Sequence, residues 1–234
     1  PPRYSVASWQ MDSGLPQHTV RAVLQTRDGH IWVGTSEGLA RFNGTAFTVF
    51  NRTNTPEFPN SPITALLEAP DGSLWIATDG SGVSSLRDGR ITRYSVGTDI
   101  LSTRVFALAL GLDGSIWIGT AGGVNRFKAG RFTRFTEADG LVRNMVRSLR
   151  CARSGELWVG TSLGVSVIKH DAVTHDPGAE ELSSYDVRLL FEDGAGGRWI
   201  VTNSAEARQQ GGTLARYTST AGLAPQNVES LLED

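Results

Sequence analysis

The sequence has little cysteine, no long apolar run and no excess of charge of either sign. Its 234 residues include one cysteine, Cys151, which excludes an internal disulfide. No stretch approaches the roughly 18 consecutive apolar residues of a membrane helix, and the first ten residues, PPRYSVASWQ, lack the apolar region of a signal peptide. The formal net charge of -2 provides no general attraction to phosphate backbones or anionic membranes. We therefore expect a soluble globular protein that binds no nucleic acid and makes no membrane contact through this segment, although it could be the mature part of an exported protein.

One phrase recurs along the chain, as DGHIWVGT from Asp28, DGSLWIAT from Asp71 and DGSIWIGT from Asp113. Five units of this kind have tryptophans separated by 43, 42, 41 and 41 residues: Trp32, Trp75, Trp117, Trp158 and Trp199. A β-branched residue lies twelve positions before each of them: Val20, Ile63, Val105, Val146 and Val187. The constant offset indicates two strands and a turn of one length in every copy, with the variation confined to other loops.

Each unit has the pattern of a four-stranded meander. In the first unit, VRAVLQT from Val20 and HIWVGT from His30 flank the DG turn, and LARF from Leu39 and AFTVF from Ala46 flank a second turn. No segment combines helical apolar spacing with helix caps, so the predicted fold is all-β. Four strands in about 41 to 43 residues are typical of a β-propeller blade.

We predict one β-propeller domain over residues 1–234, with five complete blades and partial strands at both ends. The predicted first strands begin near residues 20, 63, 105, 146, 187 and 228. Since a seven-bladed ring would need roughly 290 residues at this period, the chain is expected to be part of a larger ring.

The repeat predicts structural roles for three recurring residue types. The five tryptophans should fill the wedge between adjacent blades. The threonine three residues after each tryptophan should satisfy a backbone group where the second strand ends. The preceding Gly34, Gly119 and Gly160 should allow close backbone approach, whereas Ala77 and Val201 take that place in the other units.

The two ends and the last two units depart from the simple pattern. Trp9 lies eleven residues before Val20, as Tyr94 lies eleven before Val105, which predicts that YSVASW from Tyr4 is the fourth strand of a preceding blade. NVESLLED from Asn227 should begin a sixth first strand. In the fourth unit Asp176 replaces the last aromatic residue, and in the fifth unit AEARQ replaces a strand like LARF. We expect these two blades to be distorted.

The units VRAVLQTRDGHIWVGTSEGLARFNGTAFTVF and VFALALGLDGSIWIGTAGGVNRFKAGRFTRF resemble the repeats of the two-component regulator propeller family. That family forms seven-bladed propellers in the periplasmic sensor regions of hybrid histidine kinases and diguanylate cyclases. The resemblance implies a periplasmic location for this segment. The sequence contains no kinase or cyclase segment, so any such activity would lie outside it.

Variable residues at equivalent places on one face of a repeated scaffold are where a binding site is usually built. In this sequence, such variable residues follow the loops that lead into the first strands. The candidate ligand-binding residues are His18, Arg21, Asn144, Arg147, Tyr185 and Arg188. The three arginines favour an acidic or sugar-like ligand because guanidinium groups form planar hydrogen-bond pairs.

Catalytic and metal-binding patterns are weak. The four histidines show no metal-like clustering, and each DG pair offers one carboxylate in a two-residue turn, far fewer than the six to eight oxygens that calcium prefers. No phosphate-binding loop or nucleophile elbow is found. We predict no catalytic residues, no metal and no cofactor.

Three classes of function remain open. The first is a non-enzymatic extracytoplasmic sensor that binds a small molecule or glycan, or pairs with a second copy or an adjoining propeller. The second is a protein-interaction scaffold similar to the WD-repeat propellers. The third is a lyase similar to the streptogramin lyases, which would need a His/Glu pair and a metal at the channel mouth.

Overall fold

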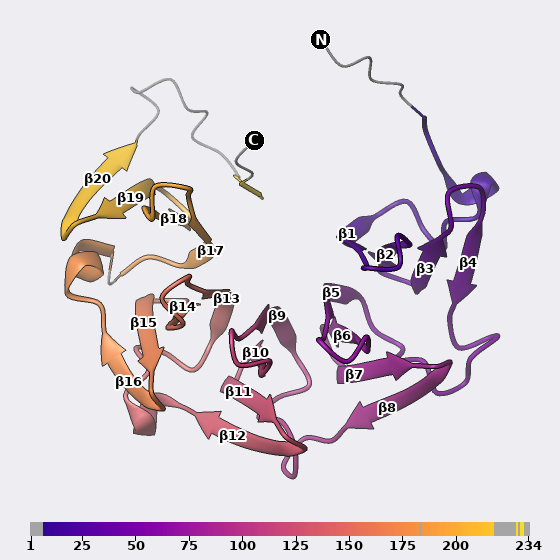
Figure 1. The fold of residues 1–234 in the computed structure, drawn as a ribbon, viewed down its shortest axis with the longest axis horizontal. Helices are drawn as coiled ribbons and strands as arrows, with labels where there is room; N and C mark the ends of the chain where they lie inside the picture. The colour runs from indigo at the N-terminus through magenta and orange to yellow at the C-terminus, as the bar shows by residue number, and fades with distance from the viewer. Residues whose placement is uncertain (1–6, 183, 218–227, 229, 232–234) are drawn as a thin grey trace. The chain divides into compact units, whose positions relative to one another are not determined.

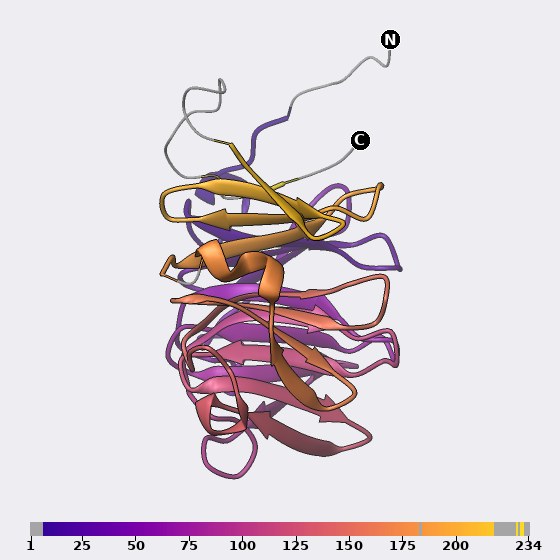
Figure 2. The ribbon, with the colours of Figure 1, turned by 90° about the vertical axis from the view of Figure 1, so that its left-hand side faces the viewer.

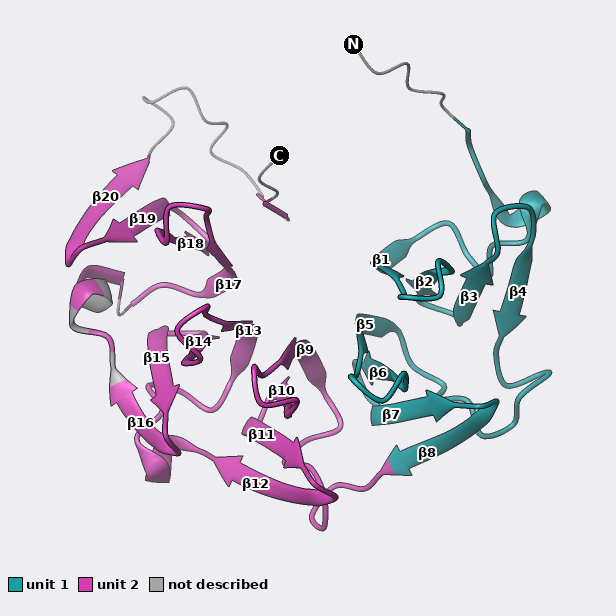
Figure 3. Ribbon diagram, in the orientation of Figure 1, with its two compact units in different colours: residues 1–93 teal, residues 94–234 magenta. Residues whose placement is uncertain are grey.

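A computed structural model describes residues 7–182, 184–217, 228, 230 and 231 of the chain (Figure 1). The chain divides into two units, residues 1–93 and 94–234, which are considered separately (Figure 3). Every described strand belongs to a four-stranded antiparallel sheet whose strands pair in chain order. Each sheet is a meander of the kind predicted for one blade.

The first unit holds two of these sheets, preceded by a short 3-10 turn, η1 (Met11–Ser13). The first sheet contains β1 (Val20–Gln25), β2 (Ile31–Thr35), β3 (Leu39–Phe42) and β4 (Phe47–Phe50). The second sheet contains β5 (Ile63–Glu68), β6 (Leu74–Thr78), β7 (Gly82–Arg87) and β8 (Arg90–Tyr94), of which Tyr94 is grouped with the second unit.

The second unit holds three sheets. The third blade contains β9 (Val105–Leu110), β10 (Ile116–Thr120), β11 (Gly123–Lys128) and β12 (Arg131–Phe135), followed by η2 (Glu137–Asp139). The fourth contains β13 (Val146–Cys151), β14 (Leu157–Thr161), β15 (Gly164–Lys169) and β16 (Ala172–His175), followed by η3 (Pro177–Leu182). The fifth contains β17 (Val187–Glu192), β18 (Arg198–Thr202), β19 (Glu206–Gln210) and β20 (Thr213–Tyr217).

The all-β prediction and the five complete blades are confirmed. The expected distortion of the fourth and fifth blades is wrong, because both form four paired strands. Asp176 lies just after β16, and AEARQ still pairs with both neighbouring strands, so the backbone ladder is kept. Among the described residues, no helix is long and apolar enough to cross a membrane.

The apolar cores lie between consecutive blades of each unit. In the first unit, Trp32 and Leu39 pack with Ile63 and Ile76 of the following blade. In the second, one cluster joins Trp117 to Val146, and another joins Trp158 to Val187. Burying each such aliphatic side chain stabilises the fold by about 1.5–3 kcal/mol. The predicted core role is confirmed for the four buried tryptophans, whereas Trp199 in the fifth blade is only partly buried.

The repeated threonines bind the backbone as predicted. Each hydroxyl donates to the carbonyl oxygen at the start of the third strand over 2.8–2.9 Å. In the first blade, Gly38 N also donates back to Thr35 Oγ1 over 3.1 Å. One fully buried hydroxyl thus serves as both donor and acceptor where β2 turns into β3, which leaves no unpaired polar group there.

The repeated glycines leave room for the next blade. A Cβ atom at Gly119 would lie 2.7 Å from Val146 Cγ1, and one at Gly160 would lie 2.7 Å from Val187 Cγ1. Both contacts are shorter than van der Waals distance, so an alanine at either place would push the first strand of the next blade away. The prediction of close approach is confirmed.

The turns at the DG pairs are longer than the two residues predicted. In the first blade Thr26 N donates to His30 O and Gly29 N donates to Thr26 O, which leaves a three-residue loop. Gly29 has a φ of 87°, a left-handed conformation that favours glycine. Three-residue hairpin loops commonly end with such a residue, so the glycine closes the loop and the preceding aspartate caps it.

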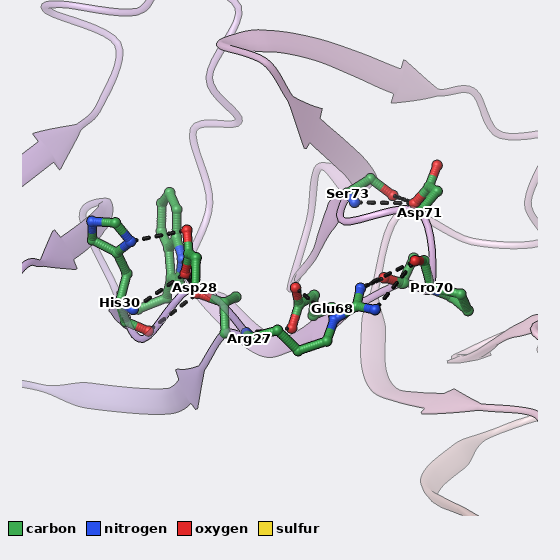
Figure 4. Close-up of polar contacts among 10 residues, drawn as sticks. Arg27, Asp28, His30, Glu68, Pro70, Asp71 and Ser73 are labelled. Carbon is green, nitrogen blue, oxygen red and sulfur yellow. Dashed lines mark hydrogen bonds and ion pairs between the residues drawn. The ribbon is translucent and has the colours of Figure 1, made fainter.

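A second set of contacts at these turns links consecutive blades (Figure 4). Arg27 Nε lies 3.1 Å from Glu68 Oε1, and the Arg27 guanidinium donates to the carbonyl of Pro70. The same arrangement recurs in the second unit, where Arg153 N donates to Glu192 Oε2 over 2.9 Å. The turn of one blade therefore binds the last residue of the next blade's first strand, a glutamate in both cases.

The turn aspartates predict acid sensitivity. Hydrogen bonds, first of all from Thr26, lower the pKa of Asp28 to about 2, and the bond from Lys128 holds the pKa of Asp113 well below its usual range. A carboxylate whose folded-state pKa is lowered adds stability above its unfolded pKa near 3.9 and loses it as the pH falls through the folded value. Thermal midpoints should therefore fall between pH 4 and pH 2.

The variant Asp113→Asn should show a smaller fall over the same pH window. Because Asp113 is 45% exposed, solvent screening limits its share to about 1 kcal/mol or less. Thermal unfolding followed by circular dichroism at pH 7, 4, 3 and 2 would measure this difference. A variant whose midpoint ran parallel to that of the natural protein would contradict the assignment.

The missing aromatic residue of the fourth blade is compensated from the fifth. Within other blades the tryptophan packs against the last aromatic residue, as Trp117 does with Phe135 at 5.7 Å between ring centroids. In the fourth blade Arg198 Cζ lies 4.8 Å from the centre of the Trp158 ring, and the guanidinium forms an ion pair with the carboxylate of Asp176. The side chains of Arg198 and Asp176 are both buried. The 3-10 helix η3 begins directly after Asp176 and contacts β15 and β20 (Figure 2).

The predicted strands at the two ends have different outcomes. Residues 7–10 form no strand among the described residues, and 1–6 lie outside them. Trp9 nevertheless packs on Phe42 with 5.1 Å between ring centroids, just as Tyr94 packs on the equivalent Phe127 at 5.6 Å. The register argument for Trp9 is thus supported by its ring contact. The predicted sixth first strand, over 227–234, falls almost wholly outside the described residues.

Candidate functional site

The first strand of every blade contains a bulge at its second residue. The strand register skips one position between the first and third residues in each case. The bulged residues are Arg21, Thr64, Phe106, Arg147 and Arg188. Bulges redirect side chains and are frequent beside binding sites.

Three of these bulges, in the consecutive blades of the second unit, meet in one cluster. Arg147 Nε lies 3.2 Å from Asp186 Oδ1, and Arg188 Nε lies 3.9 Å from Asp186 Oδ2. On the other side, Arg147 Cζ lies 5.2 Å from the centre of the Phe106 ring, and Arg104 Cζ lies 5.3 Å from the same centre. We call this set, Arg104, Phe106, Arg147, Asp186 and Arg188, the arginine row.

The arginine row combines a positive charge excess with partial exposure. Three guanidinium groups against one carboxylate give it two more positive than negative charges. The side chains of Arg147 and Arg188 are 34% and 50% exposed, whereas Asp186 is 24% exposed. The Phe106 ring contacts the guanidinium groups of Arg104 and Arg147, and such cation-π contacts favour particular guanidinium positions. The row therefore presents oriented hydrogen-bond donors that match carboxylate or other oxyanion groups.

Two of the predicted site residues, Arg147 and Arg188, are brought together by their shared contact with Asp186. Asn144 lies close by but is engaged in the loop after η2. Its Oδ1 accepts from Glu137 N over 2.7 Å, and its own N donates to Glu137 Oε1 over 2.9 Å. This mutual pair holds the loop, so Asn144 has a structural task.

The contacts of Tyr185 are with residues outside the arginine row. Its ring packs against the cluster around Leu182 and Val187, and Arg216 Cζ lies 5.9 Å from its centre. The other two predicted residues belong to the first unit. There His18 is exposed and Arg21 Nε donates to Ser36 Oγ over 3.3 Å.

Sequence reasoning missed Arg104, Asp186 and the contacts of the Phe106 ring with two arginines. Arg104 and Asp186 occupy one and the same repeat position, directly before the first strand. Aligning the five units at this position would have shown charged residues in two of the three last blades. The pairing of Asp186 with two arginines depends on the bulge geometry, which the repeat spacing does not reveal.

No group of three or more histidine, cysteine or acidic side chains in the described part of the chain is arranged to hold a metal ion. The arginine row itself contains no histidine and one carboxylate. Its chemistry is that of binding through donors rather than of proton transfer or metal coordination.

The fold defines a class of protein, the β-propellers. The extracellular domain of BT3049 from B. thetaiotaomicron, described as a hybrid two component system, matches with a TM-score of 0.78 at 20% sequence identity, over 89% of this chain and 31% of that one. The extracellular domain of BT4673 from the same organism matches with a TM-score of 0.70 at 19% identity, over 85% and 30%. Virginiamycin B lyase from Staphylococcus aureus matches with a TM-score of 0.66 at 12% identity, over 85% and 69%.

Within that class, residues 14–37 and 57–80 match the model of the two-component regulator propeller. The resemblance found in the sequence is thereby confirmed. No curated protein matches the sequence. The chain spans about a third of the length of the first two similar structures, and identities of 20% or less show a common fold alone.

Proposed function

We propose that this chain is a non-enzymatic, ligand-binding part of an extracytoplasmic sensor and that the arginine row is its binding site. The observation that carries the proposal is the meeting of three bulged or flanking arginines from consecutive blades around one ring and one carboxylate. The family match and the extracellular domains among the similar structures support the sensor class and its location outside the cytoplasm.

The ligand that suits the arginine row is a small molecule or glycan with two or more acidic groups. Asp186 already neutralises part of the charge of Arg147, so a single carboxylate would have to compete with it. A ligand with several acidic groups would bind both Arg147 and Arg104 and so join adjacent blades. Binding that joins folded elements stabilises the folded state in proportion to ligand concentration.

The test measures binding of citrate and digalacturonate by thermal shift and calorimetry. Arg147→Gln should weaken binding by at least about tenfold, since it removes a charge-assisted contact. Asp186→Asn should have the opposite effect and strengthen binding, because it frees the guanidinium of Arg147. The exposed Arg131→Gln, on β12 and outside the row, is the control and should change nothing.

Two outcomes would overturn the proposal. One is the absence of a shift with every acid tried, together with a stoichiometric complex with a protein partner, which would favour the interaction scaffold. The other is turnover of a ligand by the purified chain, which would favour a lyase.

A further inference from the structure

The first unit contains a cavity of about 600 Å³ between its two blades, beside the DG turns. Its volume is within the range of small-molecule sites. The lining combines apolar and ionised side chains, including Trp32, Phe50, Leu86, Asp28, Arg41 and Asp71. None of these residues belongs to the arginine row.

Arg41, on β3, is the unusual member of this lining. Its Cζ lies 5.7 Å from the centre of the Trp32 ring. Its Nε is buried without a hydrogen-bond partner among the described residues, as is that of Arg126, but unlike Arg126 it forms no ion pair with a carboxylate of that part of the chain. A guanidinium that is partly removed from water and lacks a partner carries a free-energy cost that an anion would offset.

The repeat shows what such an arginine binds when a partner is present. Arg126 holds the equivalent position on β11, with Cζ 5.3 Å from the Trp117 ring. It forms an ion pair with the carboxylate of Asp171, in the turn between β15 and β16 of the following blade. The cavity there measures about 320 Å³.

The first unit has Gly89 where the second has Asp171. Both are the second turn residue between the third and fourth strands, and both have a positive φ, 74° and 62°. The carboxylate that neutralises Arg126 is therefore replaced by a hydrogen atom near Arg41.

Besides Arg41, the lining holds Arg87 and four carboxylates, Asp28, Glu68, Asp71 and Asp88, of which Glu68 pairs with Arg27 and Asp88 lies 3.7 Å from Arg87. Asp28 accepts from Thr26 and lies near His30, and Asp71 accepts from Ser73 and pairs with Arg87 at 3.0 Å (Figure 4). Ionised carboxylates accept hydrogen bonds and donate none. A ligand here must therefore offer one anionic group for Arg41 and several donors for the aspartates.

We propose that this cavity binds a hydroxylated carboxylic acid of the sugar-acid class. Its carboxylate takes, at Arg41, the place that the Asp171 side chain holds at Arg126, and its hydroxyl groups donate to Asp28 and Asp71. The site is separate from the arginine row and requires a single acidic group rather than several.

The experiment uses D-glucuronate as the probe and isothermal titration calorimetry of the full chain. Gly89→Asp should weaken binding by at least about tenfold, because the new carboxylate occupies Arg41. The substitution is suited to the backbone, since Asp171 already adopts that conformation and a Cβ at Gly89 would meet no atom within 4 Å. Gly89→Asn, which adds the same shape without charge, should keep binding within about twofold of the natural protein.

Further variants and ligands distinguish this cavity from the arginine row of the proposed function. Arg41→Gln should abolish binding of D-glucuronate, Arg147→Gln should leave it unchanged, and D-glucose and acetate should each bind at least about tenfold more weakly. Failure of the natural chain to bind D-glucuronate, equal binding by Gly89→Asp and Gly89→Asn, or a loss with Arg147→Gln instead of Arg41→Gln would each overturn the proposal. Thermal midpoints of the two Gly89 variants show that both are folded.

Discussion

Replacing Asp176 with alanine is expected to destabilise the protein by about 3–5 kcal/mol, since it leaves a buried guanidinium without its counterion. The side chains of Arg198 and Asp176 are only 9% and 8% exposed. Burial lowers the pKa of Arg198 to about 10, which still leaves it charged at pH 7. Its remaining direct contacts, the Trp158 ring and Gln209 Oε1 at 3.0 Å from Nε, are neutral, and the Glu156 carboxylate acts on it only through a charge interaction without an ion pair.

The matched control for this prediction restores the pattern of the other blades. There the position of Asp176 holds an aromatic residue and that of Arg198 an aliphatic one. The double variant Asp176→Phe with Arg198→Ile should therefore be as stable as the natural protein or more stable, because apolar replacements of buried ion pairs often are.

Thermal unfolding followed by circular dichroism measures both variants. For a chain of this size each kcal/mol corresponds to about 2–4 °C in the midpoint. An alanine variant within about 2 °C of the natural protein would show that the pair is not a significant contributor to stability, and a double variant less stable than the single one would show that geometry rather than charge decides at this place.

The compensation between Asp176 and Arg198 marks the limit of what the repeat could predict. The register placed Asp176 in the aromatic slot, and from that we expected a distorted blade. The actual solution lies 22 positions further along, on the first residue of β18, where a different blade supplies the stacking partner. Contacts between blades are not encoded in the offset within a blade, so a departure in one unit and its remedy in the next look unrelated.

Features local to one unit were predicted well for the opposite reason. The threonine at the end of the second strand and the glycine before it act through the neighbouring turn and the adjacent strand, and both recur at fixed offsets. The predicted length of the DG turn was wrong because the type of a hairpin loop depends on its backbone angles. By composition, Gly29 fits both a two-residue and a three-residue loop.

The candidate site lies between these cases. The bulge and strand-entry positions were recognised as variable, and Arg147, Arg188 and Tyr185 were predicted as candidates on that ground; their binding of a ligand stays a prediction. The ring of Tyr185 packs against the core cluster that contains Leu182, the last residue of η3. Direction of a side chain at a strand start depends on the loop before it, which the repeat does not conserve.

Trp117→Ala is expected to cost about 3–5 kcal/mol, the usual range for a buried aromatic residue in a closed core. Trp117 is 7% exposed, packs against Phe135 and joins the cluster that contains Val146 of the next blade. Removing the indole leaves a cavity between two blades that rigid strands cannot close. Thermal unfolding of the purified variant measures the loss.

Trp199→Ala is the matched comparison, since it changes the same residue at the same repeat position. Trp199 stacks on Tyr217 at 5.1 Å between ring centroids and donates to Asp193, but within the described residues no following blade covers it. Its truncation should cost less than half as much as that of Trp117, because part of the space it leaves is open to water. Equal losses at the two positions would mean that contacts within one blade, and not the seam with the next, carry the contribution of these tryptophans. A large loss at Trp117 alone would place the stability of the second unit in the seams between its blades.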